Sequence, residues 1–341
     1  MPSVSTASPD PRSLSPRTDS LYTLLVFLSL VLVLVVVVLS AYLRLAGSGL
    51  GCAGWPACYA LIKSPAGGTE SLAAAHLVPA WATVIHRLAA STLGAMVLGI
   101  TLMALRRRRR PGHNTGLSLA VLGLTVFLSV LGYKTPSPLL PWVTLSNLLG
   151  GMAMLAMLWW LGQRSVIPKN EKMNVVDHAL RPWAWVGLGI VFLQIALGGW
   201  VSANFAALSC TDLPGCGGYP WTGGPWRESF NLFRELPVTD GGAVIAGDAG
   251  KIIHLAHRAG AVFIFLYLGW LGWRTVALGG RYRGTGIAIL VFLAFQILLG
   301  AVAVAYSLPL GLVTAHNAIA ALLLLSVVNL YHLLTPAANI R

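Results

Sequence analysis

The chain has 341 residues, of which 56% are apolar and only 10% are charged, and its formal net charge is +13. A soluble domain has about 25% charged residues, so most of this chain cannot face water and we expect an integral membrane protein. The positive charge requires no nucleic acid, because a basic rim beside anionic lipid accounts for it.

A polar tail and eight apolar runs follow one another along the chain. Residues 1–20 are rich in Ser and Pro, and we expect a disordered cytoplasmic tail there. The apolar runs are long enough to cross about 30 Å of hydrocarbon, where only helices satisfy their own peptide groups. The predicted fold is therefore all-α, with membrane helices at 21–43, 77–105, 116–133, 141–163, 182–204, 251–273, 285–306 and 311–333.

One chemical pattern occurs twice: a Cys-x5-Cys pair, then a loop, then His-Arg in an apolar segment. The two copies are Cys52, Cys58 and His86-Arg87, and Cys210, Cys216 and His257-Arg258. Such a repeat indicates a doubled ancestral unit. We therefore predict two pseudo-symmetric four-helix bundles in tandem, at 21–163 and 182–335, joined by a cytoplasmic linker at 164–181.

Basic residues predict the orientation in the membrane. Fifteen of the 23 Lys and Arg residues lie in the tail and in the loops of one side, which places both termini in the cytoplasm. All four cysteines then lie in outer loops, where close thiols are normally oxidised. Three connectivities exist, and the repeat favours Cys52–Cys58 and Cys210–Cys216; a structural and a redox role both remain open.

Two histidines in the second half have the depth expected of a cofactor site. His257 and His316 each lie about five to seven residues inside a helix that enters from the outer side. No predicted membrane helix contains an acid, so a site for a hard cation is disfavoured, and two imidazoles fit a bis-histidine heme. Arg258 is expected either to pair with heme propionates or to extend toward lipid headgroups.

Several segments closely resemble signatures of the heme A synthase family in its proteobacterial form. They are RLAGSGLGCAGWPACYA, VIHRLAAS, LSCTDLPGCGG, KIIHLAHRAGA and VTAHNAIAALLLL, and the resemblance covers about residues 21–335. It implies a bacterial inner-membrane oxidoreductase that converts heme O to heme A for cytochrome oxidase, by oxidising the C8 methyl group to formyl.

The resemblance also implies roles for individual residues. His257 and His316 match the axial ligands of a resident heme b, and His86 matches a ligand of the substrate heme, heme O. Arg87 and Arg258 are expected near propionates. The expected partners are heme O, the farnesyltransferase that produces it, the lipid bilayer and, in a homo-oligomer, further copies of the chain.

The first half departs from the family pattern at two positions. Thr83 stands where the family has Glu, one helical turn before His86. Asn147 stands where the family has a second histidine. If the alignment is set on the Val-Thr pair instead, Ser146 stands at that position. Either His86 alone supports the chemistry, or the chain is a heme-binding paralogue that acts as carrier, sensor or assembly factor. We favour the enzyme, because the outer-loop pattern is retained.

A transporter is the alternative from another class. Its supporting features are the internal repeat and the intramembrane residues Gln194 and Gln296. The absence of carboxylates from the predicted membrane helices weighs against ion-coupled transport.

Overall fold

The computed structural model describes residues 20–48, 79–108, 112–134, 140–166, 175–219, 222–240 and 243–335. The predictions of a disordered tail before Ser20 and of a Cys52–Cys58 disulfide lie outside these residues.

Eight helices in the described ranges are long and apolar enough to cross a membrane, which confirms the predicted all-α membrane fold. Two short helices and one isolated bridge, between Val238 and Val244, follow α6 on the way to α8, and no strand occurs among the described residues. The elements are α1 (Ser20–Gly47), α3 (Ala80–Arg106), α4 (Thr115–Lys134), α5 (Pro141–Val166), α6 (Val175–Ala203), η1 (Ala206–Leu208), α7 (Trp226–Ser229), α8 (Gly247–Ala277), α9 (Gly280–Ala305) and α10 (Leu310–Leu333).

Three helices begin earlier than their apolar runs. We predicted starts at 182, 251 and 285, whereas α6, α8 and α9 begin at 175, 247 and 280. An apolar run marks only the part of a helix inside hydrocarbon, and the polar turns beyond it continue the same helix. At α6 and α9 the added turns are joined, because the buried Asp177 accepts hydrogen bonds from Arg281, at 2.9 Å, and from the Tyr282 hydroxyl.

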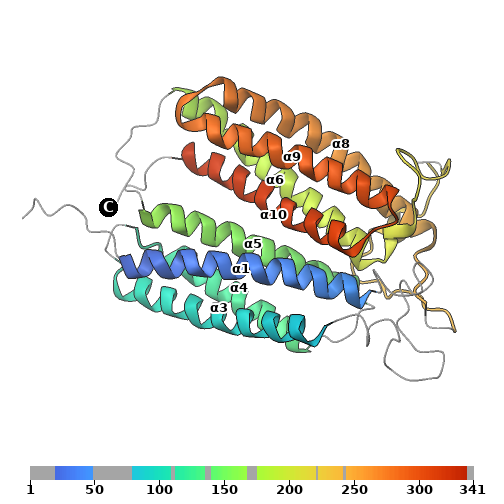
Figure 1. The fold of residues 1–341 in the computed structure, drawn as a ribbon, viewed down its shortest axis with the longest axis horizontal. Coiled ribbons are helices and arrows are strands. Elements are labelled where there is room, and N and C mark those ends of the chain that lie inside the picture. Colours follow the sequence, from blue (N-terminus) through green and yellow to red (C-terminus); the bar gives the residue numbers. More distant parts are fainter. Residues whose placement is uncertain are drawn as a thin grey trace, which may run out of the picture.

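The helices pack as two groups that share a core. In one group α1 packs against α3 and α5, and α4 joins α3 to α5; in the other α8 packs against α6 and α9, and α10 against α9 and α6. Figure 1 shows the two groups side by side, with α1 and α5 facing α10. One apolar cluster runs through both groups and includes Val26, Leu155, Leu268 and Leu324.

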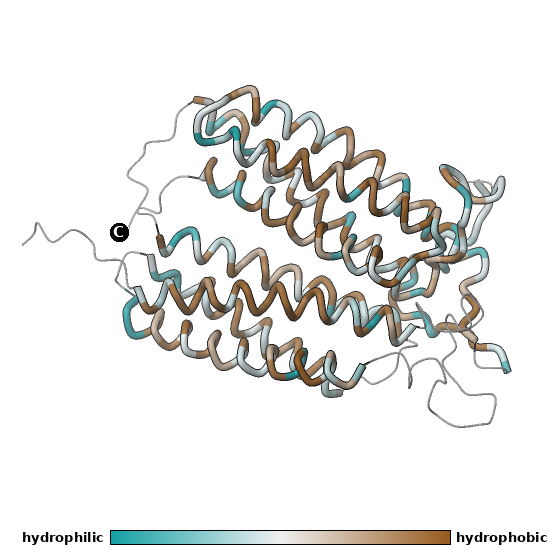
Figure 2. Tube along the Cα trace, in the orientation of Figure 1, coloured by the Kyte–Doolittle hydropathy of each residue, from teal (hydrophilic) through white to brown (hydrophobic). Residues whose placement is uncertain are grey.

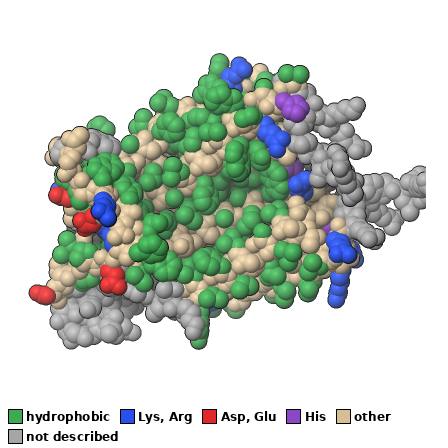
Figure 3. Space-filling model, turned by 180° about the vertical axis from the view of Figure 1, so that it is seen from behind, with side chains coloured by type: hydrophobic (Ala, Val, Ile, Leu, Met, Phe, Trp, Pro, Cys, Tyr) green, Lys and Arg blue, Asp and Glu red, His purple; other side chains and the backbone are tan. Residues whose placement is uncertain are grey.

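The surface has the polarity expected of a membrane protein. Apolar residues run along the helices and hydrophilic ones gather toward their ends (Figure 2). Figure 3 shows a wide apolar belt, with Asp and Glu at the loop-bearing end and most of the visible Lys and Arg at the other. Leu193, Phe263 and Leu266 are among the exposed large side chains of this belt. Large apolar side chains exposed in this way are favourable only where lipid covers them.

Candidate functional site

A cavity of about 460 Å³ lies where the two helix groups meet. Its walls come from α6, α8, α9 and α10 on one side and from α1 and α5 on the other. Most of the lining is apolar, and the volume is within the range of small-molecule and cofactor sites.

His257 and His316, from α8 and α10, both line this cavity. His316 is the seventh residue of α10, and His257 is the eleventh of α8, whose first turn precedes its apolar run. The two imidazoles that the sequence places at one depth therefore face a shared space. Helices α8 and α10 both pack against α6 and α9, and this packing brings the two histidines to the same cavity.

Each of these histidines has a glutamine partner that sequence reasoning did not assign to it. Gln194 on α6 has its Nε2 atom 3.1 Å from Nδ1 of His257, and Gln296 on α9 has its Nε2 atom 2.9 Å from Nε2 of His316. In the sequence alone, the two glutamines support only the transporter alternative. Their position beside the cavity histidines assigns them to the same site instead.

His254 and Arg44 are two further polar residues that line the cavity. His254, one turn before His257, is 5% exposed, and its Nδ1 atom has no hydrogen-bond partner among the described residues. Arg44, near the end of α1, contributes a guanidinium from the other helix group. No pattern within α1 indicated that Arg44 would share a cavity with residues of α8 and α10, because the cavity exists only in the tertiary structure.

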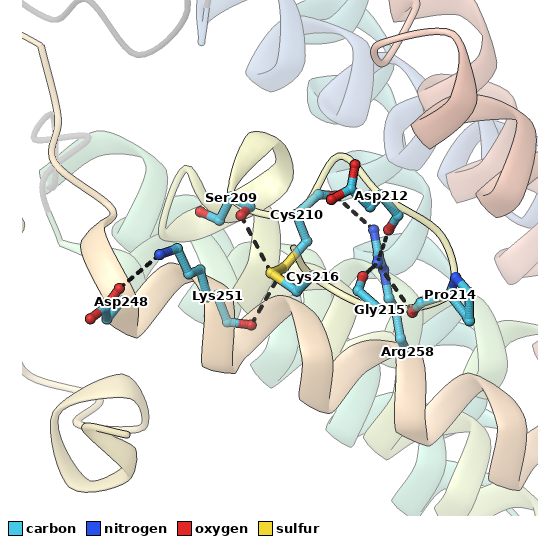
Figure 4. Close-up of a disulfide and its surroundings, with 9 residues drawn as sticks. All are labelled: Ser209, Cys210, Asp212, Pro214, Gly215, Cys216, Asp248, Lys251 and Arg258. Atoms are coloured by element: carbon cyan, nitrogen blue, oxygen red, sulfur yellow. Dashed lines mark hydrogen bonds and ion pairs between the residues drawn. A yellow bond between two sulfur atoms is a disulfide. The ribbon is translucent and has the colours of Figure 1, made fainter. Parts of the chain in front are cut away.

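Arg258 also borders the cavity, but its terminal nitrogens contact the disulfide-bearing loop of residues 210–216. Nη2 donates to the carbonyl oxygen of Cys210 at 2.6 Å, and Nη1 donates to those of Asp212, at 2.6 Å, and Gly215 (Figure 4). Neither the propionate nor the lipid interpretation of Arg258 anticipated this arrangement. The guanidinium holds the loop of residues 210–216 against α8.

The predicted disulfide between Cys210 and Cys216 is present in that loop. Both cysteines are buried, in a cluster with Leu255 and the partly buried Tyr219. Thiol exchange requires access to a sulfur atom, so this burial favours a structural role over a redox role.

The candidates from the first half lie elsewhere. His86 is the seventh residue of α3 and is half-buried, Arg87 is exposed, and Thr83 lies one turn before His86. Asn147 is the seventh residue of α5 and is half-buried. None of these four residues is among those that line the cavity of His257 and His316.

The cavity suits a flat apolar group with a metal at its centre and acidic edges. Two imidazoles supply nitrogen ligands that iron accepts, and apolar walls match a macrocycle. His254 Nδ1, His316 Nδ1 and Gln296 Oε1 are buried and have no hydrogen-bond partner among the described residues. Buried polar atoms without partners are costly, so their convergence on one cavity indicates a ligand site, and heme fits it.

Comparisons with known proteins agree with this chemistry. The sequence model of the COX15-CtaA family, described as cytochrome oxidase assembly protein, matches residues 23–328. The chain is 35% identical over 321 residues to the heme A synthase of Shewanella oneidensis, covering 92% of this chain and 96% of that protein. It is 24% identical over 260 residues to the heme A synthase of Nitrosomonas eutropha, covering 71% and 68% respectively.

Proposed function

The chain belongs to the COX15-CtaA family of cytochrome oxidase assembly proteins, and we propose that it is a heme A synthase, a membrane oxidoreductase that converts heme O to heme A. The observation that carries this proposal is similarity to the Shewanella enzyme along nearly the whole of both chains. The cavity with its two histidines supports it, because two imidazoles between apolar walls suit a heme.

We propose that His257 and His316 would hold a resident heme b through their imidazole nitrogens. When bound, this group supplies a one-electron redox centre. The apolar walls of the cavity exclude water, and Gln194 and Gln296 hold the two imidazole rings. His254 and Arg44 lie where a hydrogen-bond donor and a positive charge can meet propionates.

For the substrate, we propose that His86 on α3 holds the iron of heme O. Thr83 and Asn147 leave this site without the carboxylate and the second imidazole that the family resemblance leads one to expect. A Thr hydroxyl donates and accepts hydrogen bonds but does not titrate near neutral pH. These two departures favour the second candidate function, a heme-binding paralogue that serves as carrier, sensor or assembly factor.

Charge supports the proposed orientation, in a bacterial inner membrane with both termini in the cytoplasm. Arg106, Arg164 and Arg274 lie in the last turns of α3, α5 and α8, at the end of the bundle opposite the disulfide loop. Basic residues of this kind remain on the cytoplasmic side. The cavity then lies toward the outer half of the membrane, and the farnesyltransferase that produces heme O is the partner that we propose for substrate delivery.

A turnover assay tests the function. The purified protein is supplied with heme O, air and a reductant, and the products are separated by chromatography. We expect heme A or its hydroxymethyl precursor, and we expect His86→Ala to prevent its formation. His178→Ala, which alters an exposed histidine at the start of α6, is the matched control. Bound heme b with heme O returned unchanged would contradict the enzyme and favour the paralogue.

A further inference from the structure

Three helices bring aromatic rings together at the end of the bundle opposite the disulfide loop. Helices α5, α6 and α10 each pack against the other two, so they join the first helix group to the second. The ring centroid of Trp160, on α5, lies 5.4 Å from that of Tyr331, on α10. Trp185, on α6, has its ring centroid 5.6 Å from that of Tyr331. The three rings therefore mark the line along which the two groups meet.

Two arginines lie over these rings, one from each helix group. The Cζ atom of Arg164, on α5, is 6.0 Å from the centroid of the Trp160 ring. The Cζ atom of Arg181, on α6, is 5.9 Å from the centroid of the Tyr331 ring. Both distances are within the range of cation–π contacts, and both arginine side chains are partly buried. A guanidinium held in this way loses less freedom when its N–H groups bind an anion.

The two arginines have no acidic partner in the described part of the chain. Asp177 is the only Asp or Glu that the described ranges place at this end of the bundle, because the others lie between residues 212 and 248. Both carboxylate oxygens of Asp177 accept hydrogen bonds from Arg281, at 2.9 and 3.0 Å. The positive charges of Arg164 and Arg181 are therefore available to an anion.

The surroundings indicate which anion fits. Trp and Tyr concentrate at the boundary between hydrocarbon and water, where lipid headgroups lie, and the Trp185 side chain is 60% exposed. Basic pockets between membrane helices bind the headgroups of anionic lipids. Phosphate oxygens accept from guanidinium groups with strong, charge-assisted hydrogen bonds. A phospholipid supplies the phosphate at the depth where the two arginines lie.

We propose that Arg164 and Arg181, with Trp160 and Tyr331, form a binding site for the headgroup of one anionic phospholipid. The phosphate accepts hydrogen bonds from both guanidiniums. Because Arg164 belongs to α5 and Arg181 to α6, the bound lipid bridges the two helix groups at the end far from the disulfide loop. The site needs neither heme nor the proposed enzymatic activity.

Exposed arginines at the same end of the bundle provide a matched comparison. Arg106 and Arg274 lie in the last turns of α3 and α8, and both are exposed. Among the described residues, neither has a ring beneath its guanidinium. If net charge alone attracts anionic lipid, loss of this pair is equivalent to loss of Arg164 and Arg181. If the rings build a site, only the second pair affects binding.

The test measures lipid binding to the purified, full-length protein by native mass spectrometry. Phosphatidylglycerol is compared with phosphatidylcholine of the same acyl chains, which has the phosphate but no net charge. We expect the parent to bind one phosphatidylglycerol more tightly than phosphatidylcholine. Arg164→Gln with Arg181→Gln should weaken phosphatidylglycerol binding about twenty-fivefold, or about fivefold for each charge lost. Arg106→Gln with Arg274→Gln should keep the affinity of the parent.

Three results would overturn the proposal. Equal losses in the two double variants would show that the basic rim attracts lipid through its net charge. Equal binding of the two lipids by the parent would show that no anionic headgroup is selected. Displacement of phosphatidylglycerol by an equal concentration of inorganic phosphate would show a site for small anions instead. A parent that binds phosphatidylglycerol in this way but lacks a b-type spectrum contradicts only the proposed heme b site.

A second variant changes the site without changing its charge. Tyr331→Leu removes the ring beneath Arg181 and leaves both guanidiniums in place. It should weaken phosphatidylglycerol binding about two- to fivefold, the factor expected for one exposed cation–π contact. Should the Arg164→Gln, Arg181→Gln protein fail to fold, this variant is the substitute. Unchanged binding in folded Tyr331→Leu counts against the aromatic part of the site.

Discussion

Arg258 donates from Nη2 to the carbonyl oxygen of Cys210 at 2.6 Å, so the disulfide loop of residues 210–216 is tied to the residue that directly follows His257. Four carbonyl oxygens of that loop accept from this one guanidinium. The loop is thereby anchored to α8 one residue from a proposed heme ligand.

Loss of this guanidinium should loosen the loop. In Arg258→Met, the backbone amides of residues 210–216 should exchange with deuterium faster, because the carbonyls that held the loop to α8 have lost their donor. Hydrogen exchange followed by mass spectrometry measures this. Asp248→Asn, which removes an exposed ion pair with Lys251 on the same helix, should leave the exchange unchanged.

Removal of one proposed axial ligand should abolish the b-type spectrum. His316→Ala leaves the cavity with a single imidazole, and the reduced-minus-oxidised absorption of a bis-histidine heme should disappear. His332→Ala, a buried histidine at the other end of α10 and outside the cavity, should retain it. An unaltered spectrum in His316→Ala would refute the ligand assignment.

The buried ion pair between α6 and α9 should respond unequally to loss of either partner. Arg281→Met removes the cation 2.9 Å from the carboxylate of Asp177, whose side chain is 1% exposed, and should cost about 3 kcal/mol. Asp177→Asn should cost less, because the Arg281 side chain is 32% exposed and reaches water. Thermal unfolding in detergent compares the two; an equal loss would show that burial does not decide the cost. In the double variant, part of the Arg281→Met loss should be recovered.

Crowding the ring of His257 should weaken cofactor binding. Gly198→Ala places a Cβ atom 3.0 Å from Cε1, and overpacking of this kind costs about 1–3 kcal/mol, or roughly ten- to hundredfold in heme affinity. Gly189→Ala, on the same helix and with open space around its Cβ, should bind heme as the parent does. Transfer of heme to excess apomyoglobin measures the difference.

Restoring the expected family residues should increase turnover if the first half is degenerate. Thr83→Glu with Asn147→His supplies a carboxylate one turn from His86 and a second imidazole on α5. In a paralogue this double variant should convert heme O while the parent does not. In a competent enzyme the parent already forms product, and the double variant is then expected to change the rate rather than to create the activity.

The membrane helices could be predicted from sequence because hydropathy depends on each segment alone. The polar turns at the starts of α6 and α9 were missed, since Asp177 and Arg281 meet only in the folded chain. His257 and His316 could be placed at one depth by counting residues from the helix mouths. Their glutamine partners could not, because helix neighbours and ring nitrogens are properties of packing.

The second half contains one more signal, which points to the glutamine partners. The motif Gln-x3-Gly appears in both α6 and α9, at the spacing that places two residues on one helix face. For Arg258, the neighbour in sequence and the contacts of the side chain differ. Its adjacency to His257 suggested a role at the cofactor, whereas its direction in the structure is toward Cys210 and Gly215.

The cavity wall is shared, with Arg44 and Leu148 on one helix group and His257 and His316 on the other. A molecule bound there acts as a bridge between two parts of the polypeptide, and a ligand that binds only the folded chain stabilises it by mass action. Occupancy of the proposed heme b site should therefore raise the free energy of unfolding of the chain.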